Sequence, residues 1–318
     1  MLSGDMIAAL VKSLLNEEQQ ATLARERDVD FAFSWLDRAR FRGSAFTERG
    51  MTALSLRMIP SKIPSFVELG LPSIAEWVVK LQRGFVLVTG PTGSGKSTTL
   101  ASIIDRINET RGLHILTIED PVEYVHHHKL SAVTQREIGL DSPSFERALR
   151  SALREDPDVI LIGEMRDIES IQMALTMAET GHLVFATLHT NDAPQAIDRI
   201  IDVFPAWRQE QTRVQLAASL GAVIAQRLLP RIDGGMVAAF EILIATNPVR
   251  NLIREGKSNQ LLNIMTTNQK EGMRTLETSL AELIQDGTVE YEEALSTSAH
   301  PKELARAVSQ VRLNSVNA

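Results

Sequence analysis

The run from Gly90 to Ser97 holds the residues of this chain whose types and spacing most clearly predict chemistry. It fits G-x-x-x-x-G-K-[ST], a glycine-rich loop whose backbone N–H groups surround the phosphates of a nucleotide. Residues 84–89 predict a strand before it and residues 98–107 a helix after it, and a helix N-terminus attracts anions. The residues expected to bind a nucleoside triphosphate are Gly90, Pro91, Thr92, Gly93, Ser94, Gly95, Lys96, Ser97 and Thr98.

Two predicted strands end in acidic residues, the first at Glu119 and the second at Glu164. Ligands of open α/β sheets lie at the carboxyl ends of strands, so both carboxylates should converge on the loop. Phosphoryl transfer needs Mg²⁺ and a group that orients the attacking water. We expect Ser97 to hold the Mg²⁺ and Lys96 to contact the β- and γ-phosphates. Glu119 and Glu164 should divide water activation and metal support, and spacing leaves open which does which. Asp120 has an equal claim to a structural role.

Histidines flank the strand predicted at residues 183–187. His189 follows this strand, where it can contact a γ-phosphate, and His182 precedes it at the opposite end. From spacing alone, a satisfied structural histidine is the preferred interpretation of each. Three consecutive histidines, residues 126–128, suggest a metal site, but adjacent side chains cannot easily converge on one ion. We expect those three to lie in a solvated loop.

Phosphoryl transfer often recruits an arginine that stabilises the charge of the transition state. Three candidates share one face of a helix predicted over residues 145–154, although most such stripes are solvated or ion-paired. Three others lie in the N-terminal region, and an arginine supplied to a neighbouring subunit would explain why that region is attached. Arg57 is the one assigned to nucleotide binding. The two groups are Arg147, Arg150 and Arg154, and Arg40, Arg42 and Arg57.

The elements that must position these residues alternate between strand and helix from Ile74 onward, which predicts an α/β fold with a parallel sheet. The expected strands are residues 85–89, 114–118, 159–162 and 183–187. After about Leu229 the chain should turn mainly helical, through residues 248–255, 259–265 and 276–285. We therefore predict a core at residues 73–229 and a helical C-terminal region at residues 230–318.

Residues 1–72 differ from this core in their pattern of predicted helices and strands. Residues 6–15 predict an amphipathic helix and residues 17–27 a polar one, followed by short strands between residues 31 and 58. Prolines then punctuate the chain and suggest a linker between two units. The prediction is a small α+β domain with its linker at residues 1–72.

The composition places limits on the class of protein. A chain of 318 residues with 44% hydrophobic and 23% charged residues should form about two globular domains. The sequence contains no cysteine, which excludes disulfides and thiolate metal sites. No run approaches the roughly 20 apolar residues of a membrane span, and residues 1–15 lack a secretory signal, so we expect a cytoplasmic location. The net charge of −7 argues against a nucleic-acid partner.

Together these motifs resemble those of the type II/IV secretion ATPase superfamily. Residues 118–124 are similar to its Asp box, residues 162–167 to its atypical Walker B motif with glycine in place of aspartate, and residues 182–189 to its His box. Within the superfamily, Val249 to Glu255 reads VRNLIRE and resembles the AIRNLIRE signature of the PilT-type retraction ATPases of type IV pili. That resemblance extends over nearly the whole chain, including residues 59–62 and 151–158.

The resemblance implies a homo-hexameric motor that hydrolyses ATP with Mg²⁺ to remove pilin subunits and so powers twitching motility. Each subunit would pair a PAS-like N-terminal domain with a RecA-like P-loop ATPase core and a helical C-terminal region. The ring would lie in the cytoplasm at the pilus base, on a platform protein of the inner membrane. The residues implied as catalytic are Lys96, Glu119, Glu164 and His189, with His189 also contacting the nucleotide. The AIRNLIRE-like segment would serve retraction, so changing Arg250 or Leu252 should spare hydrolysis.

Two features depart from the family pattern. Pro248 and Val249 stand where the signature has Ala and Ile, and a proline with its fixed φ suits a helix start. Family members also carry a longer N-terminal domain before the position of Met1. We therefore expect either a shortened chain or a minimal domain, and a shortened sheet would expose an unpaired edge.

Each alternative function has a distinguishing feature. A pilus-assembly or type II secretion ATPase typically carries a four-cysteine zinc motif, which a chain without cysteine cannot form. A PilU-like accessory retraction ATPase is closer, but should lack the run at residues 250–255. A RecA-type nucleic-acid translocase would share the phosphate loop, but the net negative charge of the chain argues against this function. A nucleotide switch without enzyme activity would bind ATP yet release no phosphate.

Overall fold

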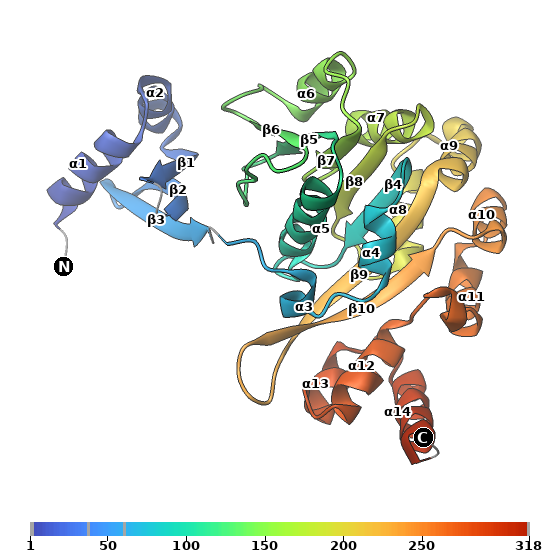
Figure 1. The fold of residues 1–318 in the computed structure, drawn as a ribbon. Coiled ribbons are helices and arrows are strands. Elements are labelled where there is room, and N and C mark those ends of the chain that lie inside the picture. The colour runs from blue at the N-terminus through green and yellow to red at the C-terminus, as the bar shows by residue number, and fades with distance from the viewer. Residues whose placement is uncertain (1–2, 37–38, 60–61, 317–318) are drawn as a thin grey trace. The chain divides into compact units, whose positions relative to one another are not determined.

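The computed structural model describes residues 3–36, 39–59 and 62–316. The chain divides into two compact units, which are described separately (Figure 1). The smaller comprises residues 1–63 and 121–125, and the larger comprises residues 64–120 and 126–318. Within the described residues, no helix is long and apolar enough to cross a membrane.

The smaller unit is a three-stranded antiparallel sheet with two helices, in strand order β1-β2-β3. Its core is small and includes Val11, Phe31 and Ala45. Gly43 is required opposite Phe31, because a Cβ there would lie 2.5 Å from the phenyl ring. The elements are α1 (Gly4–Leu14), α2 (Glu17–Glu26), β1 (Asp28–Trp35), β2 (Ala39–Glu48) and β3 (Met51–Ile59).

The larger unit is built on a seven-stranded sheet in the order β10-β9-β4-β8-β7-β5-β6 (Figure 1). All neighbouring strands run parallel except β9 and β10, which are antiparallel. The predicted α/β class with a parallel sheet is therefore confirmed, as are the four predicted strands. The strands are β4 (Gly84–Thr89), β5 (His114–Glu119), β6 (Ala132–Glu137), β7 (Val159–Ile162), β8 (Leu183–Leu188), β9 (Leu220–Pro230) and β10 (Met236–Ile244).

Three strands of this sheet, β6, β9 and β10, are missing from the prediction. The chain after about Leu229 is mainly helical, as predicted, but β9 continues to Pro230 and β10 extends the same sheet before the helices begin. Both strands are buried along most of their length, so their apolar residues form runs without alternation. Such runs cannot be distinguished from a buried helix by periodicity.

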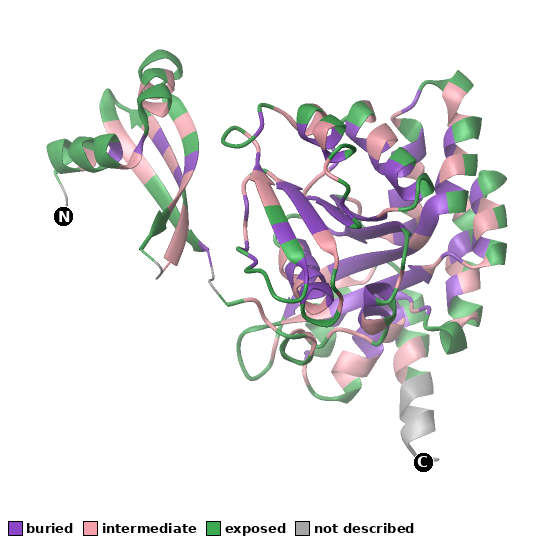
Figure 2. Cartoon of the chain, turned by 45° about the horizontal axis from the view of Figure 1, so that its top comes forward, coloured by how far each residue is buried: buried purple, intermediate pink, exposed green. Residues whose placement is uncertain are grey.

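Helices cover both faces of the sheet, and the strands between them are buried (Figure 2). Val86 and Val88 of β4 pack toward α4 and α5, whereas Leu87 faces the core shared with α6 to α9. Because side chains alternate along a strand, one apolar strand fills two cores. The helices around these cores are α3 (Phe66–Leu69), α4 (Ile74–Val79), α5 (Lys96–Thr110), α6 (Phe145–Ala152), α7 (Ile168–Glu179), α8 (Ala193–Asp202), α9 (Ala206–Ser219), α10 (Asn247–Arg254) and α11 (Leu261–Thr267).

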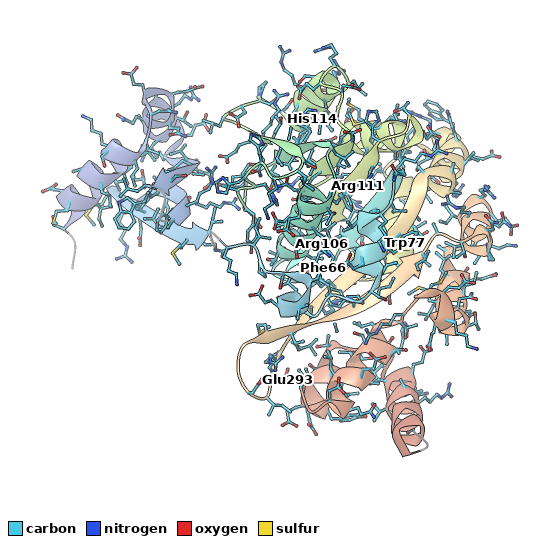
Figure 3. All side chains as sticks on the ribbon, in the orientation of Figure 1. Phe66, Trp77, Arg106, Arg111, His114 and Glu293 are labelled. Atoms are coloured by element: carbon cyan, nitrogen blue, oxygen red, sulfur yellow. The ribbon has the colours of Figure 1, made fainter. Side chains whose placement is uncertain are left out.

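Helix α5 is tied to α4 by polar contacts at its surface (Figure 3). Arg111, just after α5, donates to the carbonyl oxygens of Val79 at 2.9 Å and Leu81 at 2.7 Å. Arg106 forms an ion pair with Glu76 at 3.4 Å. These contacts fix the helix that follows the phosphate loop against its neighbour.

The C-terminal helices pack on the β9–β10 hairpin. Leu229 of β9 and Ala239 of β10 share a core with Leu280 and Leu304. The last helix, Pro301–Val316, contains no residue to which a catalytic or binding role is assigned. The elements are α12 (Leu276–Gln285), α13 (Tyr291–Thr297) and α14 (Pro301–Val316).

A buried carboxyl group on β10 makes the stability of the fold depend on pH. Glu241 is 5% exposed and accepts a hydrogen bond from the Ala193 amide at 2.8 Å. Burial raises its pKa from 4.5 to about 7, partly opposed by the Ala193 amide and reinforced by the charges of Asp192 and Glu277. A carboxyl group with a raised pKa favours the folded state below the unfolded pKa, and that advantage is lost as pH rises through the folded value.

We expect Glu241→Gln to be less pH-dependent than the wild type. Relative to the wild type, the variant should gain up to about 3 kcal/mol of unfolding free energy between pH 4.5 and pH 8. Urea denaturation of both proteins at several pH values measures this difference, with Glu271→Gln at an exposed position as control. A stability difference that stays constant with pH would contradict the assignment.

Candidate active site

The phosphate loop joins the carboxyl end of β4 to the N-terminus of α5, as the sequence predicts. Gly93 and Gly95 have φ angles of +79° and +88°, which residues with a side chain rarely adopt. Gly95 is the N-cap of α5, and no side chain caps the helix. No acidic residue stands in the first helical turn either. The amides at this N-terminal end of α5 are therefore suited to an anion.

Lys96 lies inside the loop with its side chain held by backbone carbonyl groups. Its Nζ donates to the oxygen of Gly90 at 2.9 Å and to that of Pro91 at 3.0 Å, and the residue is 8% exposed. Ser94 is 2% exposed, and among the residues that the structure describes its hydroxyl has no hydrogen-bond partner. A buried hydroxyl without a partner is costly, so this atom fits a site completed by a polar ligand. The loop therefore fits a triphosphate.

Ser97 is the second residue of α5 and is half-buried beside this loop. Within the described residues, no group of three or more histidine or acidic side chains could hold a metal by itself. Mg²⁺ commonly binds through substrate phosphates and water with one or two protein oxygens. The Ser97 hydroxyl is a protein oxygen of this kind, and Mg²⁺ held there would neutralise phosphate charge.

The two acidic strand ends lie side by side, because β5 and β7 are neighbours in the sheet with Ile118 opposite Ile162. The Gly163 amide donates to the Ile118 oxygen at 2.8 Å. A Cβ at Gly163 would lie 3.3 Å from the Glu119 Cα atom. The glycine that replaces the usual aspartate thus allows the chain segments of Glu119 and Glu164 to approach closely.

Glu164 is held between an imidazole and a guanidinium. Its Oε1 lies 3.1 Å from His189 Nε2, and its Oε2 lies 2.8 Å from the Arg166 guanidinium. Burial acts to raise the pKa of Glu164, but the hydrogen bonds and charges of Arg166 and His189 outweigh it and hold the pKa below its usual value. Glu164 is therefore a carboxylate at neutral pH.

Glu119 has different surroundings. Its Oε1 accepts from the Thr117 hydroxyl at 2.7 Å and from the Gln135 amide at 3.3 Å. The next residue, Asp120, is exposed. The Glu119 carboxylate thus accepts hydrogen bonds from a hydroxyl and an amide, whereas Glu164 pairs with a guanidinium and an imidazole.

The segment that carries His189 is bonded to the beginning of the phosphate loop. The Thr89 hydroxyl, at the end of β4, donates to the Thr190 oxygen at 2.7 Å and lies 2.6 Å from the Thr190 hydroxyl. Because His189 also contacts Glu164, one run of contacts joins the loop to the acidic end of β7. The structure therefore brings Lys96, His189 and Glu164 to the same edge of the sheet.

The other histidines lie elsewhere. His182 is at the opposite end of β8, where its Nδ1 contacts the Met177 oxygen at 2.9 Å. The expectation of a solvated loop at residues 126–128 is wrong for His126, which is 7% exposed. Burial lowers the pKa of His126 to about 4, although Asp105 opposes the shift, so this histidine is neutral. His127 and His128 are exposed.

The predicted arginine stripe is also corrected. Helix α6 ends at Ala152, so Arg154 lies beyond it and does not share a helical face with the others. Arg150 pairs with Glu146 one turn away at 2.5 Å, and Arg147 is exposed. In the smaller unit, Arg57 and Arg42 are exposed register partners on β3 and β2, and Arg40 is half-buried. The role of Arg57 in nucleotide binding stays a prediction.

Two residues of the site escape sequence reasoning. Arg166, within the atypical Walker B motif, is the ion-pair partner of Glu164. Gln226 lies on β9 and contacts the phosphate loop through its carboxamide. The sequence did contain a signal for Gln226, because it is a lone amide side chain inside the apolar run at residues 220–230. A buried polar side chain needs a hydrogen-bond partner.

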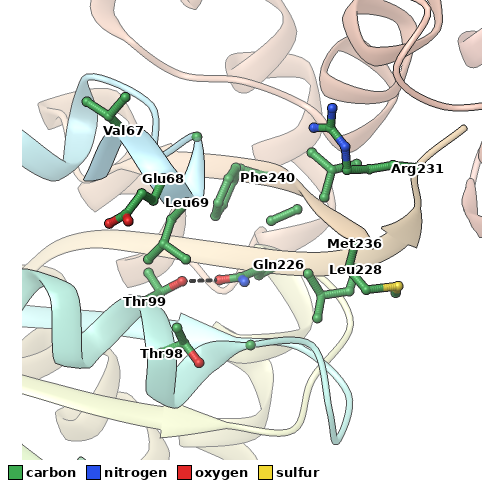
Figure 4. Close-up of a pocket in the computed structure, with 14 residues that line it drawn as sticks. Val67, Glu68, Leu69, Thr98, Thr99, Gln226, Leu228, Arg231, Met236 and Phe240 are labelled. Atoms are coloured by element: carbon green, nitrogen blue, oxygen red, sulfur yellow. Dashed lines mark hydrogen bonds between the residues drawn. The ribbon is translucent and has the colours of Figure 1, made fainter. Parts of the chain in front are cut away.

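A pocket of about 320 Å³ opens beside the first turn of α5 (Figure 4). Gly95, Thr98 and Thr99 form one wall, α3 forms a second, and the β9–β10 hairpin forms a third. Leu228 and Phe240 make much of the hairpin side apolar. The pocket is thus continuous with the phosphate loop and suited to a flat apolar group.

A sequence profile described as "Type II/IV secretion system protein" matches residues 39–296. The chain belongs to the type II/IV secretion system protein family. It is 52% identical over 295 residues to the "Twitching motility protein" of Neisseria gonorrhoeae, covering 92% of this chain and 79% of that protein. It is 48% identical over 301 residues to the type IV pilus retraction ATPase PilT of Pseudomonas aeruginosa, covering 95% and 88%.

Among solved structures, the pilus retraction motor PilT with bound ADP matches this secretion-family chain with a TM-score of 0.90. Sequence identity is 49%, and the match covers 95% of this chain and 86% of that one. The predicted resemblance to PilT-type ATPases is therefore confirmed, together with the fold class.

The segment that resembles the PilT-type signature forms most of α10 and ends just after it, at Glu255. The Arg250 guanidinium donates to the carbonyl oxygens of Ala217, Ala218 and Leu220, where α9 ends and β9 begins. Leu252 is half-buried against the main core. Both residues thus hold the fold in this region. Asn251, Arg254 and Glu255 are the exposed members of the segment.

Proposed function

We propose that this chain is the subunit of a ring-shaped ATPase that powers type IV pilus retraction and twitching motility. The observation that carries the proposal is the meeting of Lys96, in its loop, with the ion-paired Glu164 and His189 at one edge of the sheet. Kinship with PilT-type proteins supports the mechanical use of that chemistry.

The residues present can divide the work of ATP hydrolysis. Lys96 and the amides at the start of α5 bind and orient the phosphates, and Mg²⁺ held with Ser97 would neutralise their charge. Glu164 is an acceptor for a proton of the attacking water, since it is already ionised. His189, 3.1 Å from Glu164, orients that carboxylate. Glu119, whose carboxylate accepts from Thr117 and Gln135, would support the metal.

The nucleoside half of ATP occupies the pocket beside α5 in this proposal. The phosphates and this pocket meet at Gly95 and Thr98. Leu228 and Phe240 offer apolar surface to the base, and Glu68 and Arg231 line the same space with polar groups.

The assembly is proposed to be a homo-hexamer that docks on an inner-membrane platform protein at the base of the pilus. Arginines of the smaller unit, Arg57 among them, would then reach nucleotide bound to a neighbouring subunit. The exposed residues of α10, including Arg254, are suited to contacts that transmit force, since they are not needed to hold the fold.

Imaging labelled pili in a deletion strain tests the function. Loss of the gene should leave long, abundant and static fibres, because assembly continues without retraction. The wild-type gene should restore retraction, and a gene encoding Lys96→Ala should not. Cells without pili would instead indicate an assembly ATPase and contradict the proposal.

A further inference from the structure

Gln226 is a buried polar side chain in an otherwise apolar strand. It is 3% exposed, and both ends of its carboxamide are bonded to the nucleotide-binding segment. Its Oε1 accepts from the Thr99 hydroxyl at 2.8 Å (Figure 4). Its Nε2 donates to the Ser94 carbonyl at 2.7 Å. Burying an amide costs free energy unless both groups are satisfied. Here both partners belong to the phosphate loop and the first turn of α5.

The same carboxamide lies directly against the loop backbone. A Cβ at Gly95 would come within 2.8 Å of Gln226 Nε2, so only glycine allows this approach. In a trans peptide the C=O and N–H groups point in opposite directions. Holding the Ser94 carbonyl toward Gln226 therefore directs the Gly95 amide away from β9. An unbonded loop, with its positive φ at Gly93 and Gly95, would rotate this peptide more freely.

We propose that Gln226 is a positioning residue for the nucleotide phosphates. Its carboxamide sets the orientation of the Ser94–Gly95 peptide and of the first turn of α5 before the nucleotide arrives. Preorganised donors bind more tightly, because less conformational freedom is lost on binding. This inference rests on the proposed nucleotide-binding function and adds a residue from β9 to it.

The proposal extends to the strand that carries Gln226. Arg250 bonds the backbone where β9 begins, and Gln226 bonds the phosphate loop six residues further along. Gln226 thus links the phosphate loop to a strand whose beginning is held by Arg250.

Two isosteric variants test the proposal on the full chain. Gln226→Met keeps the length of the side chain and removes both bonds, whereas Thr99→Val removes only the hydroxyl bond. We expect Gln226→Met to weaken binding of a fluorescent ADP analogue with Mg²⁺ about tenfold, as befits the loss of roughly one hydrogen-bond energy. Thr99→Val should weaken binding by a smaller factor, and Thr99→Ser should restore it. The double variant should bind no more weakly than Gln226→Met alone.

A matched control separates positioning from packing. Thr212→Val also removes a buried hydroxyl bond, to the Arg208 carbonyl in α9, and is 2% exposed like Thr99. It should lower the thermal midpoint without changing nucleotide affinity. Wild-type affinity in Gln226→Met and Thr99→Val, whatever their midpoints, would overturn the positioning role. Absence of binding by the wild type would instead defeat the proposed function, so the two failures are distinguishable.

Discussion

Replacement of Lys96 by alanine is expected to abolish tight ATP binding and, with it, hydrolysis. Lys96 is 8% exposed and its ammonium group is held by two loop carbonyls, so it needs little rearrangement to meet the phosphates. Charge-assisted hydrogen bonds are about twice as strong as neutral ones. Losing contacts to two phosphates should weaken binding by about a hundredfold or more. Titration with a fluorescent ATP analogue and Mg²⁺ measures the loss.

The control for this variant is Lys129→Ala. Lys129 pairs with Asp105 and Glu109 on the outer side of α5, away from the loop, at 2.8 Å from each. The Lys129→Ala substitution removes a lysine that is bonded to the same helix, and it should leave ATP affinity unchanged. Equal affinity of Lys96→Ala and the wild type would mean that the loop does not bind the triphosphate.

Glu164→Gln is expected to keep ATP binding and to lose turnover. The amide retains the size of the carboxylate but cannot accept a proton from water. General-base catalysis contributes about 10²–10⁴-fold, so phosphate release should fall by about that factor. Because the pKa of Glu164 is held below its usual value, wild-type turnover should not decline from protonation of this group until the pH is below 4.5.

Glu119→Gln, measured beside it, decides how the two glutamates divide their roles. If Glu119 supports the metal, its loss should raise the Mg²⁺ concentration needed for half-maximal rate, whereas Glu164→Gln should leave that requirement unchanged. Normal hydrolysis by Glu164→Gln would show that the assignment of the second acidic strand is wrong. Full binding by both variants excludes misfolding as the reason for lost turnover.

Local sequence was informative wherever function depends on a short contiguous segment. The loop at residues 90–97 must join a strand to a helix, and its glycines allow backbone angles that other residues avoid. Likewise, β4, β5, β7 and β8 are short apolar runs ending at turn or acidic residues, which is why their positions could be predicted. The strands β9 and β10 were not predicted, and the reason is physical. Strands buried on both faces lose the alternation of apolar and polar residues by which a strand is recognised.

Contacts between distant segments could not be predicted in this way. Gln226 is 132 positions from Ser94, and their bond exists only because β9 lies beside β4 in the sheet. The pairing of Glu164 with His189 likewise depends on β7 and β8 being neighbours. The burial of His126 has a similar cause. Its exposure depends on how the larger unit packs around it and not on its position in a run of histidines.

By itself, then, the order of residues determined the phosphate loop, the acidic and histidine segments and the alternation of strand and helix. Each of these depends on backbone geometry or periodicity within about twenty residues. Tertiary structure decided the polar contacts: which side chains keep Glu164 ionised, which amide holds the phosphate loop, and that Arg250 bonds the end of α9. Charges and hydrogen bonds act over a few ångströms in space, and only the folded sheet brings such distant residues within that range.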